Sequence, residues 1–201
     1  MSSSYAASVA GYVPAQTATG IPNGKLGMWV FLASEVMFFT GLIGAYIVLR
    51  MSNGANWPGP EGHLSVPMGT LNTLILIGSS VTIVLSLAAS HRGAMGAARG
   101  WLLLTALLGA SFLCIKGIEY SAKFSHHLFP HTNIFWACYF TLTGFHALHV
   151  LGGIIFNLIV LSWTRRADLW QALGHRLELA GLYWHFVDIV WIFLFPLLYL
   201  I

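Results

Sequence analysis

Three ionisable side chains lie inside long apolar stretches of this chain: Glu35, His149 and Asp188. If these stretches cross a membrane, each group needs a partner, because an ionisable side chain at the centre of a spanning helix costs about 2.5 to 3.5 kcal/mol on insertion scales. At about 1.5 Å per residue, Glu35 is roughly 14 Å past Leu26 and Asp188 roughly 15 Å past Glu178. Both carboxyl groups are therefore expected near the middle of the bilayer, where His149 is also placed by its position in its own stretch.

We expect these three groups to form a buried polar cluster between helices. At least one carboxylic acid in it should be protonated, since two unpaired carboxylates repel each other strongly in a low dielectric. Such a cluster could exchange protons, or it could be a set of hydrogen bonds that locks helices together. The residues alone leave both roles open.

Two further histidines extend this predicted cluster. His146 and His149 are three residues apart and so share a helix face, and His185 could meet them from another helix. Imidazoles at this spacing can bind zinc, copper or haem iron. No third and fourth ligand at a clear metal spacing accompanies them, and polar side chains inside membranes commonly hydrogen bond to neighbouring helices. We therefore predict no metal, no cofactor and no catalytic residue on this chain.

Other charged and imidazole groups lie toward the end of a predicted helix. Lys116 and Glu119 are also three residues apart, and we expect them to form an ion pair near the outer interface. His126, His127 and His131 follow in a segment with a proline, which is typical of a solvated loop rather than a metal site.

The composition identifies the environment in which these residues act. The chain has 201 residues, of which 57% are hydrophobic, 14% aromatic and only 7% charged, with a mean hydropathy of +0.77. A soluble domain carries roughly a quarter charged residues, so an ordinary soluble enzyme is excluded, as is a charge-rich disordered chain. Only Cys114 and Cys138 are present, too few for a disulfide scaffold. The net charge of +3 comes from basic residues in short gaps between apolar runs, which is no basis for nucleic-acid binding.

The chain is predicted to be all-α, a polytopic membrane protein with a bundle of five transmembrane helices. Residues 1–24 are rich in Ala, Ser, Gly and Thr and form a polar tail without the features of a signal peptide. Residues 25–201 form the membrane domain. Its apolar runs are long enough to cross a hydrocarbon core of about 30 Å, and they span residues 26–49, 68–89, 101–123, 134–163 and 178–200.

The basic residues of the short loops predict the orientation. One side of the membrane carries six of them: Lys25, Arg92, Arg99, Arg165, Arg166 and Arg176. The other side carries three: Arg50, Lys116 and Lys123. We therefore expect a cytoplasmic N-terminus and, after five spans, a periplasmic C-terminus.

Three segments, in this order and spacing, resemble signature stretches of subunit III of the haem-copper oxidases. They are residues 34–41 (SEVMFFTG), 143–150 (TGFHALHV) and 183–191 (YWHFVDIVW). The resemblance extends from about Lys25 to the C-terminus. By motif position, Glu35 resembles the family's carbodiimide-reactive buried glutamate, His149 the second histidine of its Gly-Phe-His-x-Leu-His stretch, and Asp188 the acid of its Tyr-Trp-His-Phe-Val-Asp stretch.

The resemblance implies an accessory subunit without haem, copper or an electron path of its own. Subunit III of this family packs beside the catalytic subunit, binds phospholipid and supports proton uptake and enzyme lifetime during turnover. The implied partners are subunits I and II, which hold the haem and copper of a cytochrome c oxidase or quinol oxidase. A small subunit IV and a larger respiratory supercomplex are further implied partners, and the implied location is the bacterial inner (cytoplasmic) membrane.

Two departures from the family pattern matter. The mitochondrial-type subunit has seven helices, whereas this chain resembles the five-helix bacterial form, so the cleft that holds the family's lipids is only half encoded here. Glu119 and Tyr120 resemble the start of the family's Glu-Tyr-x-Glu stretch, but Ala122 replaces its second acid.

Two other classes of protein remain open from the residues alone. One is a stand-alone proton or ion transporter built around Glu35 and Asp188. The other is a membrane b-type cytochrome that uses His146, His149 or His185. Co-purifying chains and haem absorbance would separate these classes from an oxidase subunit.

Overall fold

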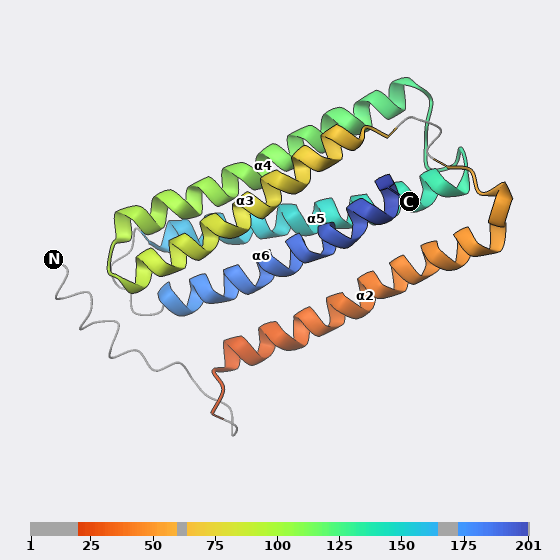
Figure 1. Cartoon of the computed structure of the whole chain (residues 1–201). Coiled ribbons are helices and arrows are strands. Elements are labelled where there is room, and N and C mark those ends of the chain that lie inside the picture. Colours follow the sequence, from red (N-terminus) through yellow and green to blue (C-terminus); the bar gives the residue numbers. More distant parts are fainter. Residues whose placement is uncertain (1–19, 60–63, 165–172, 201) are drawn as a thin grey trace.

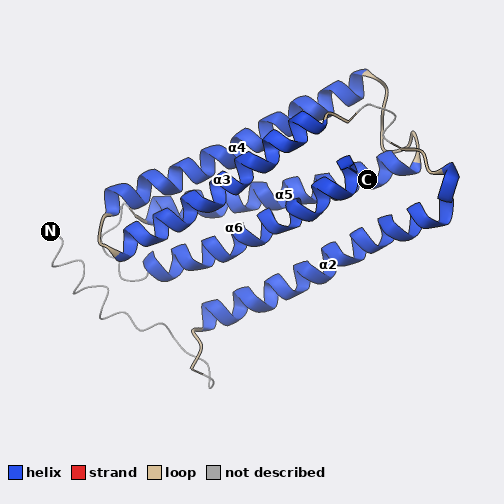
Figure 2. Ribbon diagram, viewed as in Figure 1, coloured by secondary structure: helices blue, strands red, loops and turns tan. Residues whose placement is uncertain are grey.

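The computed structural model describes residues 20–59, 64–164 and 173–200, and this part of the chain is almost entirely helical (Figure 2). Five helices are long and apolar enough to cross a membrane, which confirms the predicted all-α membrane fold. They are α2 (Asn23–Asn53), α3 (Val66–His91), α4 (Met95–Ser125), α5 (Ile134–Trp163) and α6 (Leu173–Phe195). Two short helical segments follow α2 and α6, namely η1 (Gly54–Asn56) and the π-helical η3 (Pro196–Leu200).

Local sequence signals explain where these helices begin and end. Asn133 caps α5, since its side chain accepts a hydrogen bond from the Trp136 backbone N–H at 2.9 Å. Gly54, with a φ of 49°, ends α2. Gly93, with a φ of 72°, makes the tight turn between α3 and α4, a left-handed conformation that costs glycine little. Helices α2, α3 and α4 extend beyond the predicted apolar runs at both ends, and α6 begins before its run, because polar residues at the membrane surface can continue a helix.

Helices α3 to α6 form a bundle, and α2 lies at its periphery beside α6 and α5 (Figure 1). The bundle places α3 against α4 and α6, and α5 against α4 and α6. In α2 only 17% of the most apolar 18-residue segment is buried, compared with 39% in α3 and α6. Helix α2 is therefore the least enclosed of the five.

Two buried tryptophans of α6 organise the core of the bundle. Trp184 lies against Gly109 of α4 and Gly153 of α5, where an added Cβ would come within 2.5 Å and 2.7 Å of the indole ring. These two glycines thus let α4 and α5 approach α6 closely. The indole N–H of Trp184 donates to Ser79 Oγ at 2.9 Å, and that of Trp191 donates to Thr73 Oγ1 at 3.0 Å. Hydroxyls of α3 thereby satisfy the indole N–H groups of both tryptophans.

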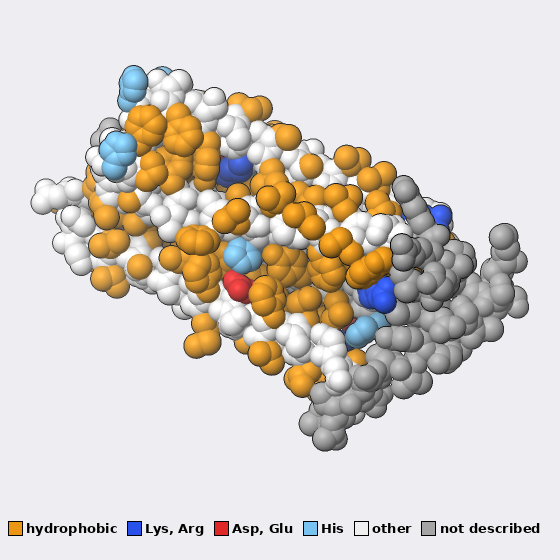
Figure 3. Space-filling model, turned by 180° about the vertical axis from the view of Figure 1, so that it is seen from behind, with side chains coloured by type: hydrophobic (Ala, Val, Ile, Leu, Met, Phe, Trp, Pro, Cys, Tyr) orange, Lys and Arg blue, Asp and Glu red, His pale blue; other side chains and the backbone are white. Residues whose placement is uncertain are grey.

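The surface of the molecule is strongly hydrophobic, and Figure 3 shows apolar side chains over most of the face that is turned away in Figure 1. On α2 the exposed side chains include Val30 (65%), Met37 (76%) and Val48 (62%). Such a surface suits lipid or another membrane helix rather than water.

Several sequence predictions concern residues outside the described part. Most of the predicted polar tail, residues 1–19, lies there. So do Arg165 and Arg166, which contribute to the predicted orientation.

Candidate functional site

A histidine–glutamate pair joins α2 to α5. His149 Nε2 lies 3.0 Å from Glu35 Oε2, and the two side chains are 17% and 19% exposed. His149 Nδ1 is 2.7 Å from the backbone oxygen of Phe145, so this nitrogen is assigned the N–H that donates to the carbonyl. The hydroxyl of Tyr183 donates to the backbone oxygen of His149 at 3.0 Å. Thus α6 also fixes this turn of α5.

This geometry leaves one proton to be shared between Glu35 and His149. With Nδ1 carrying a hydrogen, Nε2 either accepts a hydrogen bond from a protonated Glu35 or donates one, as imidazolium, to the carboxylate. Both forms have the same total charge and differ only in the position of the proton. A proton that moved from one group of the pair to the other would therefore leave the net charge of the pair unchanged.

The Glu35–His149 pair faces outward rather than into the bundle. It lines a shallow hollow of about 400 Å³ together with Ser34, Phe38 and Phe145. The rings of Phe38 and Phe39 are 6.5 Å and 5.1 Å from the imidazole, measured between centroids. Polar atoms thus reach the lipid-facing surface in a setting that is otherwise aromatic.

His146 does not join this pair, although it precedes His149 by three residues. Its ring is fully buried, stacks on Trp191 with centroids 5.0 Å apart, and meets the edge of Phe112 at 5.6 Å. Neither ring nitrogen has a hydrogen-bond partner among the described residues. Residues three apart on a helix differ by about 60° in direction, and here that is enough to turn His146 into the bundle and His149 toward α2.

His185 and Asp188 form a separate group at the contact between α3 and α6. Ser80 Oγ lies 2.5 Å from His185 Nδ1. Ser80 also interacts with Asp188, but neither carboxylate oxygen has a hydrogen bond of acceptable geometry within the described residues. Asp188 is 4% exposed. The five residues expected in one cluster therefore occupy three separate places: similar depth in the membrane does not fix which way a side chain points.

An ionic network closes the end of the bundle where α4 ends and α5 begins. Lys116 Nζ donates to Glu119 Oε2 at 2.7 Å, and Lys123 Nζ donates to Glu119 Oε1 at 3.0 Å. The hydroxyl of Tyr199 donates to the same Glu119 oxygen at 2.6 Å, and Lys116 also contacts Tyr199 at 2.5 Å. Tyr139 adds a hydroxyl contact with Tyr199 at 3.1 Å. The two residues expected as an ion pair are thus part of a larger network.

Sequence reasoning missed Lys123, Tyr139 and Tyr199 as members of this network. Lys123 could have been found, because it lies four residues after Glu119 and therefore on the same side of α4. The two tyrosines carry no such signal, since they come from α5 and η3 and meet α4 only in the folded bundle. Within the described residues, no group of three or more His, Cys, Asp or Glu side chains is placed to hold a metal ion.

Comparison with known proteins decides the family. The family model described as cytochrome c oxidase subunit III matches residues 6–201. The chain belongs to the cytochrome c oxidase subunit III family. A relative named cytochrome c oxidase subunit 3 from Corynebacterium diphtheriae is 39% identical over 179 residues, which cover 88% of this chain and 87% of the relative.

Other members of the subunit III family are similarly close. One from Thermostichus vulcanus, named cytochrome c oxidase subunit 3, is 42% identical over 179 residues, covering 88% of this chain and 86% of its own length. One from Pseudomonas aeruginosa, named cytochrome bo(3) ubiquinol oxidase subunit 3, is 34% identical over 180 residues, covering 89% and 85%. The resemblance found in the sequence is therefore confirmed.

In this subunit III family member, the three signature segments meet in space. They lie on α2, α5 and α6, and each of these helices contacts the other two. Glu35 of the first segment contacts His149 of the second, and Tyr183 of the third donates to the backbone of His149. The segments thus build one three-helix contact centred on the Glu35–His149 pair.

Proposed function

We propose that this chain is the accessory, redox-inactive subunit III of a proton-pumping haem-copper terminal oxidase in the bacterial inner membrane. Family membership across nearly the whole chain carries this proposal. The oxidase reduces oxygen to water on other subunits, which hold the haem and copper. Relatives named for cytochrome c oxidase and for ubiquinol oxidase are both similar to this chain, so the proposal covers either electron donor.

The outward-facing Glu35–His149 pair supports association with a neighbour. Polar groups that reach the surface at bilayer depth are costly in contact with lipid tails alone. The neighbouring α2 surface carries highly exposed apolar side chains, such as Met37 at 76%. In the assembled oxidase, we expect helices of subunit I, together with bound phospholipid, to cover this face and to complete the lipid cleft that five helices leave half built.

Within the complex, the pair would support proton delivery and the packing of the catalytic subunit. It can relocate a proton between a carboxyl group and an imidazole at constant net charge, as its geometry allows. We place subunit II, a small subunit IV and a respiratory supercomplex among the partners to be sought by co-purification.

The experiment that tests the proposal is purification of the tagged chain from its own membranes. We expect stoichiometric recovery of a subunit with haem and copper. A chain that purifies alone and moves ions in vesicles would support a transporter, and haem absorbance on the isolated chain, lost in His146→Ala, would support a cytochrome.

A second experiment tests the accessory role itself. Oxygen consumption is followed over many turnovers for complexes with and without this subunit, at equal haem content. Initial rates should be similar because no redox centre is removed, but activity should decay faster without the subunit. Immediate and complete loss of activity with haems retained would instead argue for a direct catalytic role.

The orientation is tested by cysteine labelling. We propose a cytoplasmic N-terminus and a periplasmic C-terminus, from the excess of Lys and Arg on the N-terminal side. A cysteine at Gly96 should react with an impermeant reagent only from the cytoplasm, and one at Gly59 or His127 only from outside. The opposite pattern would reverse the orientation.

A further inference from the structure

The ionic network at the end of α4 contains unequal charges. Lys116 and Lys123 are 4% and 3% exposed, and Glu119 is 3% exposed. Glu119 is the carboxylate that pairs with both ammonium groups, and among the described residues no second acid reaches them. Counted over the described part of the chain, the network therefore holds one excess positive charge, and its three side chains are almost inaccessible to water. Buried charge of this kind is costly unless a counter-charge is close.

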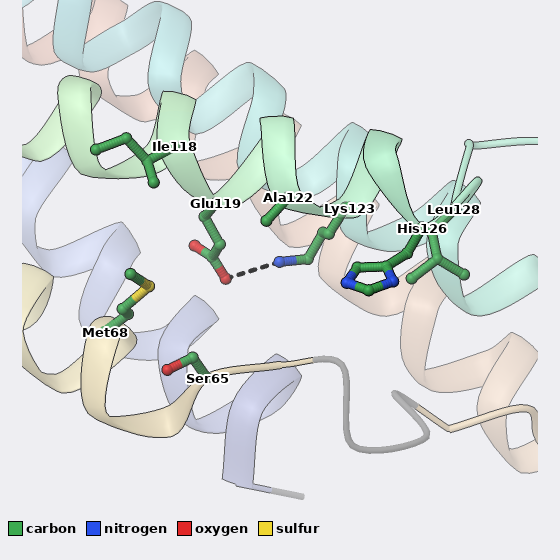
Figure 4. Close-up of a pocket in the computed structure, with 8 residues that line it drawn as sticks. All are labelled: Ser65, Met68, Ile118, Glu119, Ala122, Lys123, His126 and Leu128. Carbon is green, nitrogen blue, oxygen red and sulfur yellow. Dashed lines mark hydrogen bonds and ion pairs between the residues drawn. The ribbon is translucent and has the colours of Figure 1, made fainter.

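A pocket opens directly beside this excess charge. It has a volume of about 250 Å³ and lies between the start of α3 and the end of α4 (Figure 4). Figure 4 shows the Lys123 side chain reaching toward Glu119 along the pocket, with the His126 ring beside it. Ser65 contributes a hydroxyl, while Met68 and Leu128 are apolar. The oxygens of Glu119 already accept from three donors, so the acid is neutralised from within the protein.

The absence of an acid at position 122 keeps this pocket positive. Ala122 lines the pocket on the same helix as Glu119 and Lys123 and is exposed. A carboxylate there would neutralise the excess charge from inside the chain. With alanine instead, an anion has both space and a counter-charge.

A second hollow adjoins the pocket on the outer side of α4. It has a volume of about 580 Å³ and shares Ile118 and Ala122 with the pocket. The rest of its lining comes from Cys114, Gly117 and two serines, and Cys114 is about a helical turn nearer the bilayer centre than Ile118. A charged pocket at the helix end thus continues into a shallow surface of small side chains inside the membrane. This combination suits an amphiphile better than a free ion.

We propose that the pocket binds the phosphodiester headgroup of an anionic membrane phospholipid. The phosphate oxygens lie against the Lys123 ammonium, with His126 and Ser65 at the same wall, and an acyl chain runs over Gly117 and Cys114 along α4. The single negative charge of the lipid balances the single excess charge of the network. The site is built by α3 and α4, whereas the Glu35–His149 pair lies on α2 and α5. The inference therefore does not rest on the accessory role in an oxidase.

The experiment compares two substitutions of equal size at one position. Ala122→Glu places a carboxylate in the wall of the pocket, and Ala122→Gln adds the same volume without the charge. The purified full-length chain, with whatever subunits accompany it, is mixed with phosphatidylglycerol, and retained lipid is counted by native mass spectrometry. A phosphatidylglycerol with a photoactivatable headgroup then locates the site by peptide mapping.

We expect Ala122→Gln to retain the lipid and Ala122→Glu to lose it by a factor of about ten or more, since a juxtaposed like charge costs several kcal/mol. The crosslink should fall between residues 64 and 68 or between 118 and 128. Millimolar inorganic phosphate should not displace the lipid. Equal retention by the two variants, crosslinks confined elsewhere, or displacement by free phosphate would each overturn the proposal.

Substitutions of Lys123 provide an independent test should position 122 tolerate no large side chain. Lys123→Arg keeps the charge and should keep the lipid. Lys123→Met leaves a neutral Lys116–Glu119 pair, so the chain should remain folded but release the lipid. Lipid retention in a folded Lys123→Met variant equal to that of Lys123→Arg would contradict the proposed headgroup contact.

Discussion

The Glu35–His149 pair and the Glu119 network both place ionisable groups inside a membrane protein. The two groups differ in how the energetic cost of burying these side chains is offset. Glu119 has three donors around it and is enclosed by α4, α5 and η3. Glu35 has one hydrogen-bonding partner among the described residues, His149, and both side chains remain partly exposed on the outside of the bundle. Glu119 is therefore satisfied by groups of its own chain, whereas the Glu35–His149 pair leaves polar atoms at the surface for a neighbour to cover. A charged group at the surface of a membrane protein thus indicates a place where a neighbour packs.

The largest difference should appear when each acid is removed. Glu119→Ala leaves two buried ammonium groups without their carboxylate, which should destabilise the chain by about 3 to 5 kcal/mol. The measurement is thermal unfolding of the detergent-solubilised protein by circular dichroism.

Glu178→Ala is the matched control for Glu119→Ala. Glu178 pairs with Lys25 at 2.5 Å, but the two side chains are 39% and 33% exposed, so the loss should be about 0 to 1 kcal/mol. Equal effects of the two substitutions would show that enclosure does not distinguish the Glu119 network.

Substitution of Glu35 should have a smaller effect on the chain and a larger effect in the complex. Glu35→Ala removes the hydrogen-bond partner of His149 Nε2, which should cost about 1 kcal/mol because both groups are partly exposed. Glu35→Gln keeps the shape and a hydrogen bond and should be milder. In the oxidase, sustained oxygen consumption should decline faster for Glu35→Ala than for Glu35→Gln. If Glu35→Ala lowered the free energy of unfolding of the isolated chain by several kcal/mol, the pair would contribute to stability as strongly as the enclosed Glu119 network.

The His185 contact should contribute about as much as one neutral hydrogen bond. Ser80→Ala removes the hydroxyl that lies 2.5 Å from His185 Nδ1 and should destabilise the chain by about 1 kcal/mol. Ser111→Ala serves as its control, because Ser111 is exposed and donates to the Leu107 carbonyl of its own helix. If Ser80→Ala has no more effect than Ser111→Ala, the α3–α6 contact gains nothing from this bond.

Infrared spectroscopy can show whether the proton shared by Glu35 and His149 lies on the carboxyl group or on the imidazole. In a low dielectric, a neutral acid and a neutral imidazole are favoured over two charges. Infrared spectra at neutral pH should therefore show a carboxylic C=O band that is absent in Glu35→Gln and shifts in deuterium oxide. A carboxylate band lost in Glu35→Gln would place the proton on His149 instead.

The hydropathy pattern and the motifs were enough to predict a helical membrane fold with five spans and membership of the subunit III family. Five apolar runs of sufficient length leave helices as the only way to satisfy the backbone in lipid. The three signature segments could be read in order along the chain, and the Lys116–Glu119 spacing indicated a shared helix face. These features are local, and they depend on a few residues in a row.

The directions of the side chains were decided only by the tertiary structure. Glu35, His146, His149, His185 and Asp188 could be assigned similar depths, but depth gives one coordinate of a position in a bundle. Gly109 and Gly153 let α4 and α5 pack closely against Trp184, and in this packing His146 stacks on Trp191. In the same way, Tyr199 reaches Glu119 only because the folded bundle brings η3, which continues α6, next to Glu119 of α4. The rotation of each helix about its own axis depends on packing between segments far apart in sequence. It therefore cannot be predicted from the sequence of one helix alone.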